Sequence, residues 1–283
     1  MITEYTIPTG STFPQWITKG PDGALWFTEQ DFTFKIGRVT TSGAFTEFPI
    51  PNEGSGITTG SDGALWFAEN SANKIGRMTT AGTVTEFPAG HGPNDIAVGS
   101  DGAFWFTEFG NKVGRMTTSG TFTEVTLGSS SVVGLITAGP DGALWFSDFG
   151  ANAIGQLTTT GGFTEFTIPT SSSGPEGITA GPDGAIWFAE TNANKIGRIS
   201  TSGGAITEYS APGAPYGITT GPDGALWFTE AGGHKIGRLT TAGALTEYAT
   251  PTAGSGPRGI TTGPDGALWF VETQANKIGR ISP

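Results

Sequence analysis

Residues that could carry out chemistry are few in this chain of 283 residues. It has two histidines and no cysteine, which excludes thiolate nucleophiles, thiolate metal sites and disulfides. No Ser-His-Asp arrangement can be picked out, because serine and threonine are abundant and His91 and His234 are far apart in the sequence. The remaining candidates are Tyr216, Arg258 and Glu272. They could supply a phenol, a guanidinium and a carboxylate to one site if the fold brings them together.

The elements that must position these residues come from one motif that occurs seven times. The motif contains a turn aspartate that recurs every 39 to 42 residues, at Asp22, Asp62, Asp101, Asp141, Asp183, Asp223 and Asp265. Each unit has a segment like GITTG, a PDG or SDG turn, an ALWFTE-like segment, a KIGR-like segment, a TSG- or TAG-like turn and a TEF- or TEY-like segment. Such units predict four short strands, since their aromatic and β-branched residues favour strands and their Gly-containing pairs favour tight turns.

Seven units of four strands predict an all-β fold, a seven-bladed β-propeller with four-stranded antiparallel blades, as a single domain over residues 1–283. The seventh unit stops at KIGRISP without a fourth strand, whereas the chain begins with an isolated ITEYTIP. We therefore expect residues 2–8 to complete the blade formed by residues 258–283. With two-residue hairpin loops, the register would place Arg38 opposite Glu47 and Arg280 opposite Glu4.

The charge of the chain belongs mostly to the repeat. The net charge is −11, and most units contribute three acids and two bases. This acidity argues against nucleic acid as a partner. No apolar run is long enough to cross a membrane, and the first residues do not resemble a secretory signal. We expect a cytoplasmic monomer with no membrane partner and with a small molecule as its ligand.

Departures from the repeat gather on one rim of the predicted propeller, the rim formed by the connections after the second and fourth strands. One position there, just before the first strand, takes seven different residues: Gln15, Ser55, Asn94, Gly134, Glu176, Tyr216 and Arg258. This variation indicates an asymmetric pocket on a symmetric frame. Gln15, Trp16, Asn94 and Glu176 are the predicted ligand-binding residues. Trp16 and Tyr216 could form an aromatic floor across the ring, or could simply pack between blades.

A carboxylate also ends the second strand of every unit on this rim. The members of this series are Glu29, Glu69, Glu108, Asp148, Glu190, Glu230 and Glu272. If all seven faced the axis, their repulsion would raise some pKa values or recruit a cation. Alternatively, each carboxylate accepts hydrogen bonds between neighbouring blades.

The units resemble those of the virginiamycin B lyase family over the whole chain. The clearest matches are GPDGALWFTEAGGHKIGRLTTAGALTEY at residues 221–248 and GPDGALWFVETQANKIGR at residues 263–280. The resemblance implies a Mg²⁺-dependent elimination that linearises cyclic streptogramin B depsipeptides. It also implies two histidines at consecutive strand entries, a glutamate two residues before the second histidine, and a glutamate that ends the following ALWF-type strand.

This sequence departs from that pattern at three of the four positions. Tyr216 and Arg258 stand at the histidine positions, Gly256 stands at the first glutamate position, and only Glu272 matches. Elimination needs a base and an electrophile that stabilises the developing enolate. Arg258 stays charged at any working pH and cannot be that base, and Tyr216 would need a depressed pKa.

Three hypotheses follow from these residues. The first is a ligand-binding propeller without the lyase reaction, in which Arg258 orients a carbonyl or carboxylate and Tyr216 and Trp16 make apolar contacts. The second is a carbon–oxygen lyase with a rearranged catalytic site of Tyr216, Arg258 and Glu272, in which Glu272 helps to bind Mg²⁺ and Tyr216 or His91 replaces the base. The third is a structural or engineered repeat scaffold without a ligand.

Overall fold

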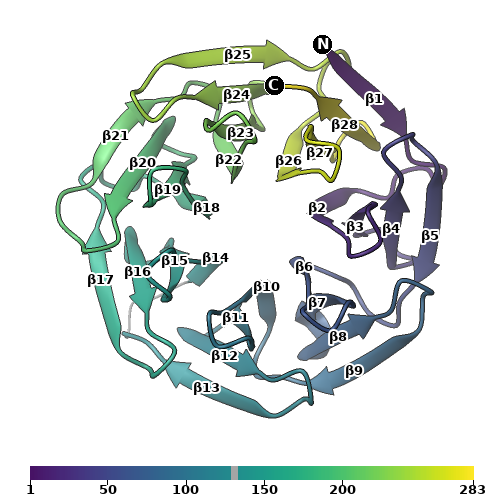
Figure 1. The fold of residues 1–283 in the computed structure, drawn as a ribbon, viewed down its shortest axis with the longest axis horizontal. Coiled ribbons are helices and arrows are strands. Elements are labelled where there is room, and N and C mark those ends of the chain that lie inside the picture. Colours follow the sequence, from purple (N-terminus) through teal and green to yellow (C-terminus); the bar gives the residue numbers. More distant parts are fainter. Residues whose placement is uncertain (129–132) are drawn as a thin grey trace.

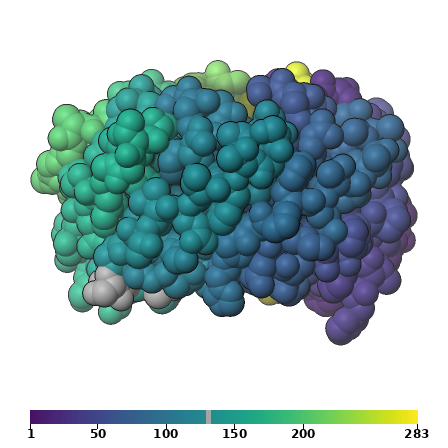
Figure 2. All heavy atoms as spheres, turned by 90° about the horizontal axis from the view of Figure 1, so that it is seen from below, coloured from purple at the N-terminus to yellow at the C-terminus, as the bar shows by residue number. Residues whose placement is uncertain are grey.

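The computed structural model describes residues 1–128 and 133–283, which fold into seven four-stranded sheets around a central axis (Figure 1). Each sheet is one blade, and its strands are antiparallel and follow one another from the axis outward. Seen from the side, the molecule is a drum that is wider than it is tall (Figure 2). The predicted seven-bladed β-propeller is confirmed.

The blades are numbered here in chain order. Blade 1 contains β2 (Pro14–Lys19), β3 (Leu25–Glu29), β4 (Lys35–Val39) and β5 (Phe45–Pro49). Blade 2 contains β6 (Ile57–Thr59), β7 (Leu65–Glu69), β8 (Lys74–Met78) and β9 (Val84–Pro88), with the short 3₁₀ helix η1 (Asn70–Ala72) between β7 and β8. Blade 3 contains β10 (Pro93–Val98), β11 (Phe104–Glu108), β12 (Lys112–Met116) and β13 (Phe122–Thr126). Blade 4 contains β14 (Val133–Ala138), β15 (Leu144–Asp148), β16 (Ala153–Leu157) and β17 (Phe163–Thr167).

The second half of the ring repeats this pattern. Blade 5 contains β18 (Pro175–Ala180), β19 (Ala185–Glu190), β20 (Lys195–Ser200) and β21 (Thr207–Ser210). Blade 6 contains β22 (Pro215–Thr220), β23 (Leu226–Glu230), β24 (Lys235–Leu239) and β25 (Leu245–Ala249). Blade 7 contains β26 (Pro257–Thr262), β27 (Leu268–Glu272) and β28 (Lys277–Ile281), and its outer strand is β1 (Ile2–Thr6). No helix among the described residues is long and apolar enough to cross a membrane.

The N-terminal strand closes the ring as predicted. β1 pairs antiparallel with β28, so that Ile2 lies opposite Ile281 and Thr6 opposite Lys277. Ile2 is buried in the cluster between blades 6 and 7. The Tyr5 ring stacks on Trp269 at a centroid distance of 5.6 Å. Closure therefore combines a backbone ladder with apolar burial.

The predicted register of the outer hairpins is wrong by one residue. Arg38 lies opposite Thr46, and Glu47 lies opposite Gly37. In the same way, Arg280 lies opposite Thr3 rather than Glu4. The loop contains three residues rather than two: the Thr40 N–H donates to the Ala44 carbonyl at 2.9 Å, and Gly43 adopts a φ of 88°. A three-residue hairpin loop needs this left-handed residue, and glycine adopts it readily.

Because of this register, arginine and glutamate find other partners on opposite faces of the blade. Arg38 Nε donates to Oδ2 of the turn residue Asp22 at 2.6 Å, and its guanidinium carbon lies 5.8 Å from the centre of the Trp26 ring. Asp22 Oδ1 also accepts from Trp26 Nε1 at 2.9 Å. Burial alone would raise the pKa of Asp22, but the hydrogen bonds from Trp26 and Arg38 outweigh it and lower that pKa. Glu4 pairs instead with Lys277, at 2.6 Å.

The core lies between the blades. Every residue of β3 is buried, because neighbouring blades cover both faces of this strand. Trp26 packs into the cluster between blades 1 and 2, whereas Phe27 packs into the cluster between blades 7 and 1. The same alternation in each unit forms seven such clusters, which hold the first strands in fixed places around the axis.

Candidate functional site

In blades 1 and 3 to 7 the variable position lies inside the first strand, not before it as the sequence had suggested, whereas in blade 2 Ser55 does precede β6. In blades 1 and 3 to 7, the pairing between the first and second strands shifts after the first residue, for example between Pro14 and Ile17. The two residues within each shift form a β-bulge. A bulge bends its strand and redirects side chains. The seven variable residues are called the axial ring below, because the first strands surround the axis (Figure 1).

Hydroxyl groups of the second strands hold these bulges in place. Thr229 Oγ1 accepts from the Gly217 N–H at 2.9 Å and donates to the Arg258 carbonyl at 2.6 Å. Thr107 Oγ1 donates likewise to the Gly134 carbonyl at 2.7 Å. The hydrogen bonds to the carbonyls of Arg258 and Gly134 link a blade to the bulge of the next blade, and the one from Gly217 fixes the bulge within blade 6. The axial ring is therefore a rigid platform.

The second residue of the bulge is glycine in blades whose first strand lies in close backbone contact with the first strand of the next blade. A Cβ atom at Gly177 would lie 2.2 Å from the Tyr216 carbonyl oxygen, and a Cβ atom at Gly217 would lie 2.5 Å from that of Arg258. The corresponding residues in blades 1 and 3 are Trp16 and Asp95. Side chains at this second position are therefore found only in part of the ring.

Four of the predicted site residues meet at this platform. The rings of Tyr216 and Trp16 stack with a centroid distance of 5.8 Å. The guanidinium carbon of Arg258 lies 5.0 Å from the centre of the Tyr216 ring. Arg258 Nη1 donates to Gln15 Oε1 at 2.9 Å. Residues of blades 6, 7 and 1 thus form one layered group of two aromatic rings, a cation and an amide.

Trp16 reaches well beyond its own blade. It packs against the cluster between blades 1 and 2 and also against the cluster between blades 4 and 5, which contains Leu135 and Ile178. The Trp16 side chain therefore extends across the axis. The two alternatives for Trp16 and Tyr216, an aromatic floor and packing between blades, are both consistent with this position.

Acidic and amide groups complete the platform. Glu176 is half-buried, which raises its pKa, and the charge of Arg258 partly opposes that effect. Asn94 Nδ2 lies 3.4 Å from the Gly134 carbonyl, and its Oδ1 lies 3.3 Å from Ser55 Oγ. Asn94 is therefore engaged mainly with the walls of the ring.

Asp95 lies beside Asn94 in the bulge of β10 and was not among the predicted ligand-binding residues. Its Oδ2 accepts from the Ile136 N–H at 2.9 Å. Burial raises the pKa of Asp95 to about 6, although backbone hydrogen bonds from Ile136 and Ile96 oppose the shift. The signal in the sequence was an acid at the position where blades 2, 5, 6 and 7 have glycine.

Proton transfer by Tyr216 is disfavoured by its surroundings. Burial, with the nearby charge of Glu176, raises the pKa of Tyr216 to about 12, and Arg258 only partly offsets this. A phenol with such a pKa does not accept a proton efficiently near neutral pH. Neither histidine belongs to the axial ring: His91 is exposed, and His234 Nδ1 accepts from the Gly256 N–H at 3.2 Å.

Glu272 is the last residue of β27 and lies opposite Pro257, the residue that precedes Arg258. Its carboxyl group nevertheless interacts with the outer strand, β1. The residue is fully buried. Burial and the neighbouring charge of Glu4 raise the pKa of Glu272 to about 8, and Lys277 partly opposes this. Glu29, Glu69, Glu190 and Glu230 have the same surroundings and the same raised pKa. The carboxyl groups of this series are therefore part of the blade architecture.

The residues present do not fit the magnesium site that the family resemblance implies. Of the implied oxygen donors only Glu272 remains, and burial of its carboxyl group raises the pKa to about 8, which disfavours the carboxylate form. Hard divalent cations prefer several ionised or neutral oxygen ligands. Within residues 1–128 and 133–283, no group of three or more His, Asp or Glu side chains is arranged to hold a metal ion.

Comparisons with known proteins agree with the fold and identify the family. The model of the virginiamycin B lyase family matches residues 1–91 and 88–283. A structure described as a streptogramin B lyase is 39% identical, with a TM-score of 0.93, over 99% of this chain and 96% of that chain. Virginiamycin B lyase from Staphylococcus aureus, in selenomethionine-substituted form, is 41% identical, with a TM-score of 0.94, over 100% of this chain and 99% of that chain.

A catalytically inactive histidine-to-alanine variant of the S. aureus enzyme, solved with quinupristin, matches with the same identity, TM-score and coverage. These matches span both chains almost completely. The chain belongs to the virginiamycin B lyase family.

Proposed function

We propose that this protein is a ligand-binding member of the family that holds a small molecule on the axial ring without cleaving it. The observation that carries the proposal is the group formed by Trp16, Tyr216, Arg258 and Gln15. Its chemistry suits a ligand with an aromatic ring next to a carbonyl or carboxylate group. Arg258 would donate to that oxygen, and the aromatic side chains would cover the ring of the ligand.

The same residues argue against an elimination. Arg258 cannot accept a proton, and the pKa of Tyr216 is raised rather than depressed. Losing a general base costs about 10²–10⁴ in rate. Because the inactive S. aureus variant was solved with quinupristin, binding and turnover can be separated in this family. The monomeric state and the cytoplasmic location of this protein remain predictions.

The alternative is a carbon–oxygen lyase with a rearranged site, and family membership favours it. In that case Arg258 would stabilise the developing oxyanion, and another group would remove the proton. Chromatography distinguishes the two, because elimination opens a cyclic depsipeptide to a product of unchanged mass. Formation of that product above the buffer rate would overturn our proposal.

The binding experiment is calorimetric titration with quinupristin as the probe, first of the unaltered protein and then of Arg258→Ala. We expect saturable binding that weakens about tenfold or more in the variant, since a charge-assisted hydrogen bond contributes about 1.5–3 kcal/mol. Arg77→Ala is the matched control, because Arg77 pairs with Asp62 at a turn remote from the axial ring. No binding to the unaltered protein, or equal binding by Arg258→Ala, would contradict the assignment.

A further inference from the structure

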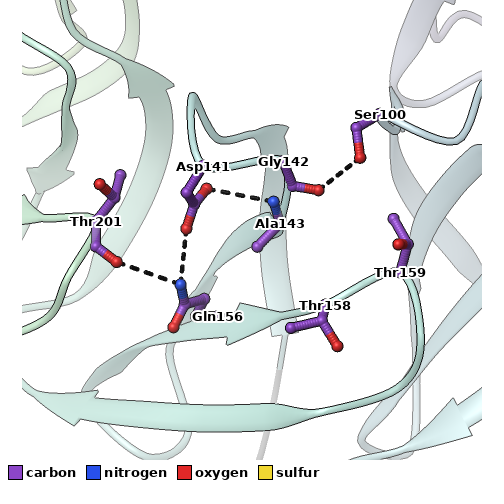
Figure 3. Close-up of a pocket in the computed structure, with 8 residues that line it drawn as sticks. All are labelled: Ser100, Asp141, Gly142, Ala143, Gln156, Thr158, Thr159 and Thr201. Carbon is purple, nitrogen blue, oxygen red and sulfur yellow. Dashed lines mark hydrogen bonds between the residues drawn. The ribbon is translucent and has the colours of Figure 1, made fainter.

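A cavity of about 530 Å³ opens at the turns of blade 4, away from the axial ring (Figure 3). Its lining includes Ser100, Asp141, Gln156, Thr158, Thr159 and Thr201, which come from blades 3, 4 and 5. In Figure 3, Asp141 and Gln156 stand on one side of the cavity, and Ser100 and Thr159 stand on the other. The walls are thus polar, with one carboxylate and several hydroxyl groups.

In the other six blades an arginine side chain pairs with the aspartate that corresponds to Asp141. In each of them the Nε or a terminal nitrogen of an arginine lies 2.6–2.8 Å from Oδ2 of the turn aspartate. The guanidinium carbon lies 5.7–5.9 Å from the centre of the tryptophan ring of the second strand. The arginines are Arg38, Arg77, Arg115, Arg198, Arg238 and Arg280. The chain therefore contains six examples of a guanidinium seated at this place.

Blade 4 has Gln156 instead of this arginine. Gln156 Nε2 donates to Asp141 Oδ2 at 2.7 Å and so takes the place of an arginine Nε. The same nitrogen lies 3.3 Å from the Thr201 carbonyl. The glutamine side chain ends at this nitrogen. Blade 4 therefore has no atoms that correspond to the guanidinium carbon and the two terminal nitrogens of the arginines. A cavity lies beside the shortened side chain (Figure 3).

Charge favours a cation in this cavity. Each of the other blades contributes a lysine and an arginine from its third strand, but blade 4 has Ala153 and Gln156 at these two positions. Asp141 therefore lacks the arginine that accompanies the turn aspartate in each of the other blades. A cation bound beside Asp141 would supply the charge that the arginine provides in the other six blades.

We propose that the cavity of blade 4 binds a small molecule that ends in an alkylguanidinium group. The guanidinium lies beside Gln156 and donates to the carboxylate of Asp141. The hydroxyl-lined remainder of the cavity accommodates the rest of the molecule. This site is separate from the axial ring, so its test does not depend on the ligand proposed there.

The experiment titrates methylguanidinium, at low salt, while the indole N–H signals of the tryptophans are followed by NMR. Trp145 Nε1 donates to Asp141 Oδ1 at 3.1 Å and reports directly on the cavity. We expect a saturable shift of the Trp145 signal with a dissociation constant on the order of 1 mM, since the carboxylate is partly open to solvent. The corresponding indoles of the other blades should not respond.

Variants decide whether the shift comes from this cavity. Gln156→Arg supplies the missing guanidinium within the chain and should abolish the shift. Asp141→Asn removes the charge and should weaken binding at least tenfold. Arg198→Gln reproduces the glutamine of blade 4 in blade 5, where Arg198 normally pairs with Asp183 at 2.7 Å. It should create a second saturable shift at Trp187.

Two results would overturn the proposal. One is a Trp145 signal that moves no more than the other indoles, which would mean that water alone fills the cavity. The other is a shift of undiminished size in Gln156→Arg. If Asp141→Asn fails to fold, Gln156→Arg and Arg198→Gln still decide between these outcomes, because neither removes a turn aspartate.

Discussion

At the residue scale, most blades contain a pair of carboxyl groups with one lysine beside them. In blade 6, Glu230 of the second strand lies near Glu247 of the fourth, and Lys235 lies 3.3 Å from Glu247. Burial first, and then a hydrogen bond and the charge of Glu247, raise the pKa of Glu230 to about 8. The raised pKa favours the neutral form of the buried glutamate, and a neutral carboxyl group is far less costly to bury than a carboxylate.

This protonation makes stability depend on pH. The folded pKa of about 8 exceeds the ordinary value of 4.5, so between these values the folded state binds more protons than the unfolded state. Stability is highest below the ordinary pKa and falls as pH rises through about 8. We expect the melting temperature to fall by several degrees from pH 5 to pH 9, because five such glutamates have this raised pKa.

Glu230→Gln tests the cause, since glutamine resembles the neutral acid. The dependence of its melting temperature on pH should be shallower than that of the unaltered protein, whereas Glu53→Gln, outside the carboxyl pairs, should leave the dependence unchanged. Melting temperatures that rise between pH 5 and pH 9 would contradict this explanation.

At the element scale, one strand closes the ring. β1 supplies the outer edge of blade 7, buries Ile2 and stacks Tyr5 on Trp269. Glu4 in the same strand pairs with Lys277 and accepts from the Thr252 hydroxyl, each at 2.6 Å. Blade 7 would thus lose its outer ladder, its aromatic cover and an anchored ion pair if the strand were absent.

Deletion of residues 1–8 should therefore destabilise the protein strongly. Losing one buried large apolar side chain costs about 2–5 kcal/mol, and this deletion removes Ile2 and Ile7 together with the ladder. We expect the melting temperature to fall by ~10 °C or more. Deletion of Met1 alone is the control, because Met1 is fully exposed. Equal melting temperatures for the two deletions would show that closure by β1 contributes nothing.

The elements could be predicted because seven near-copies of one unit leave little ambiguity about strand number and order. The register of the outer hairpins could not be predicted in this way. One additional residue in the loop shifts the pairing by one residue, so that Arg38 and Glu47 lie on opposite faces of the blade. The repeat pattern also did not show which way the Glu272 carboxyl group points, because its neighbour Glu4 comes from the other end of the chain.

The candidate site was predicted in part. Strand direction was enough to place Tyr216 and Arg258 near the axis. For Tyr216 and Trp16 the sequence left two alternatives open, an aromatic floor and packing between blades. Asp95 was missed as a site residue, since its importance depends on how the bulge buries it. The cavity beside Gln156 was missed as well, because sequence shows that an arginine is replaced but not what fills the space it leaves.

At the scale of the whole molecule, seven similar blades place seven different residues around one axis. The shared residues build clusters, turns and carboxyl pairs, whereas the residues at and beside the axial ring differ from blade to blade and meet across blades. Trp16 of blade 1 meets Tyr216 of blade 6, and Arg258 of blade 7 lies beside both Tyr216 and Gln15. We expect the function of this family member to follow from this asymmetric group.

A crystal structure of the protein grown with quinupristin and Mg²⁺ tests this account most directly. We expect the ligand to be intact on the axial ring, with an oxygen atom within hydrogen-bond distance of Arg258 and an aromatic ring against Tyr216 or Trp16. An opened ligand with Mg²⁺ bound by Glu272, or a ligand bound away from the axial ring, would contradict the account.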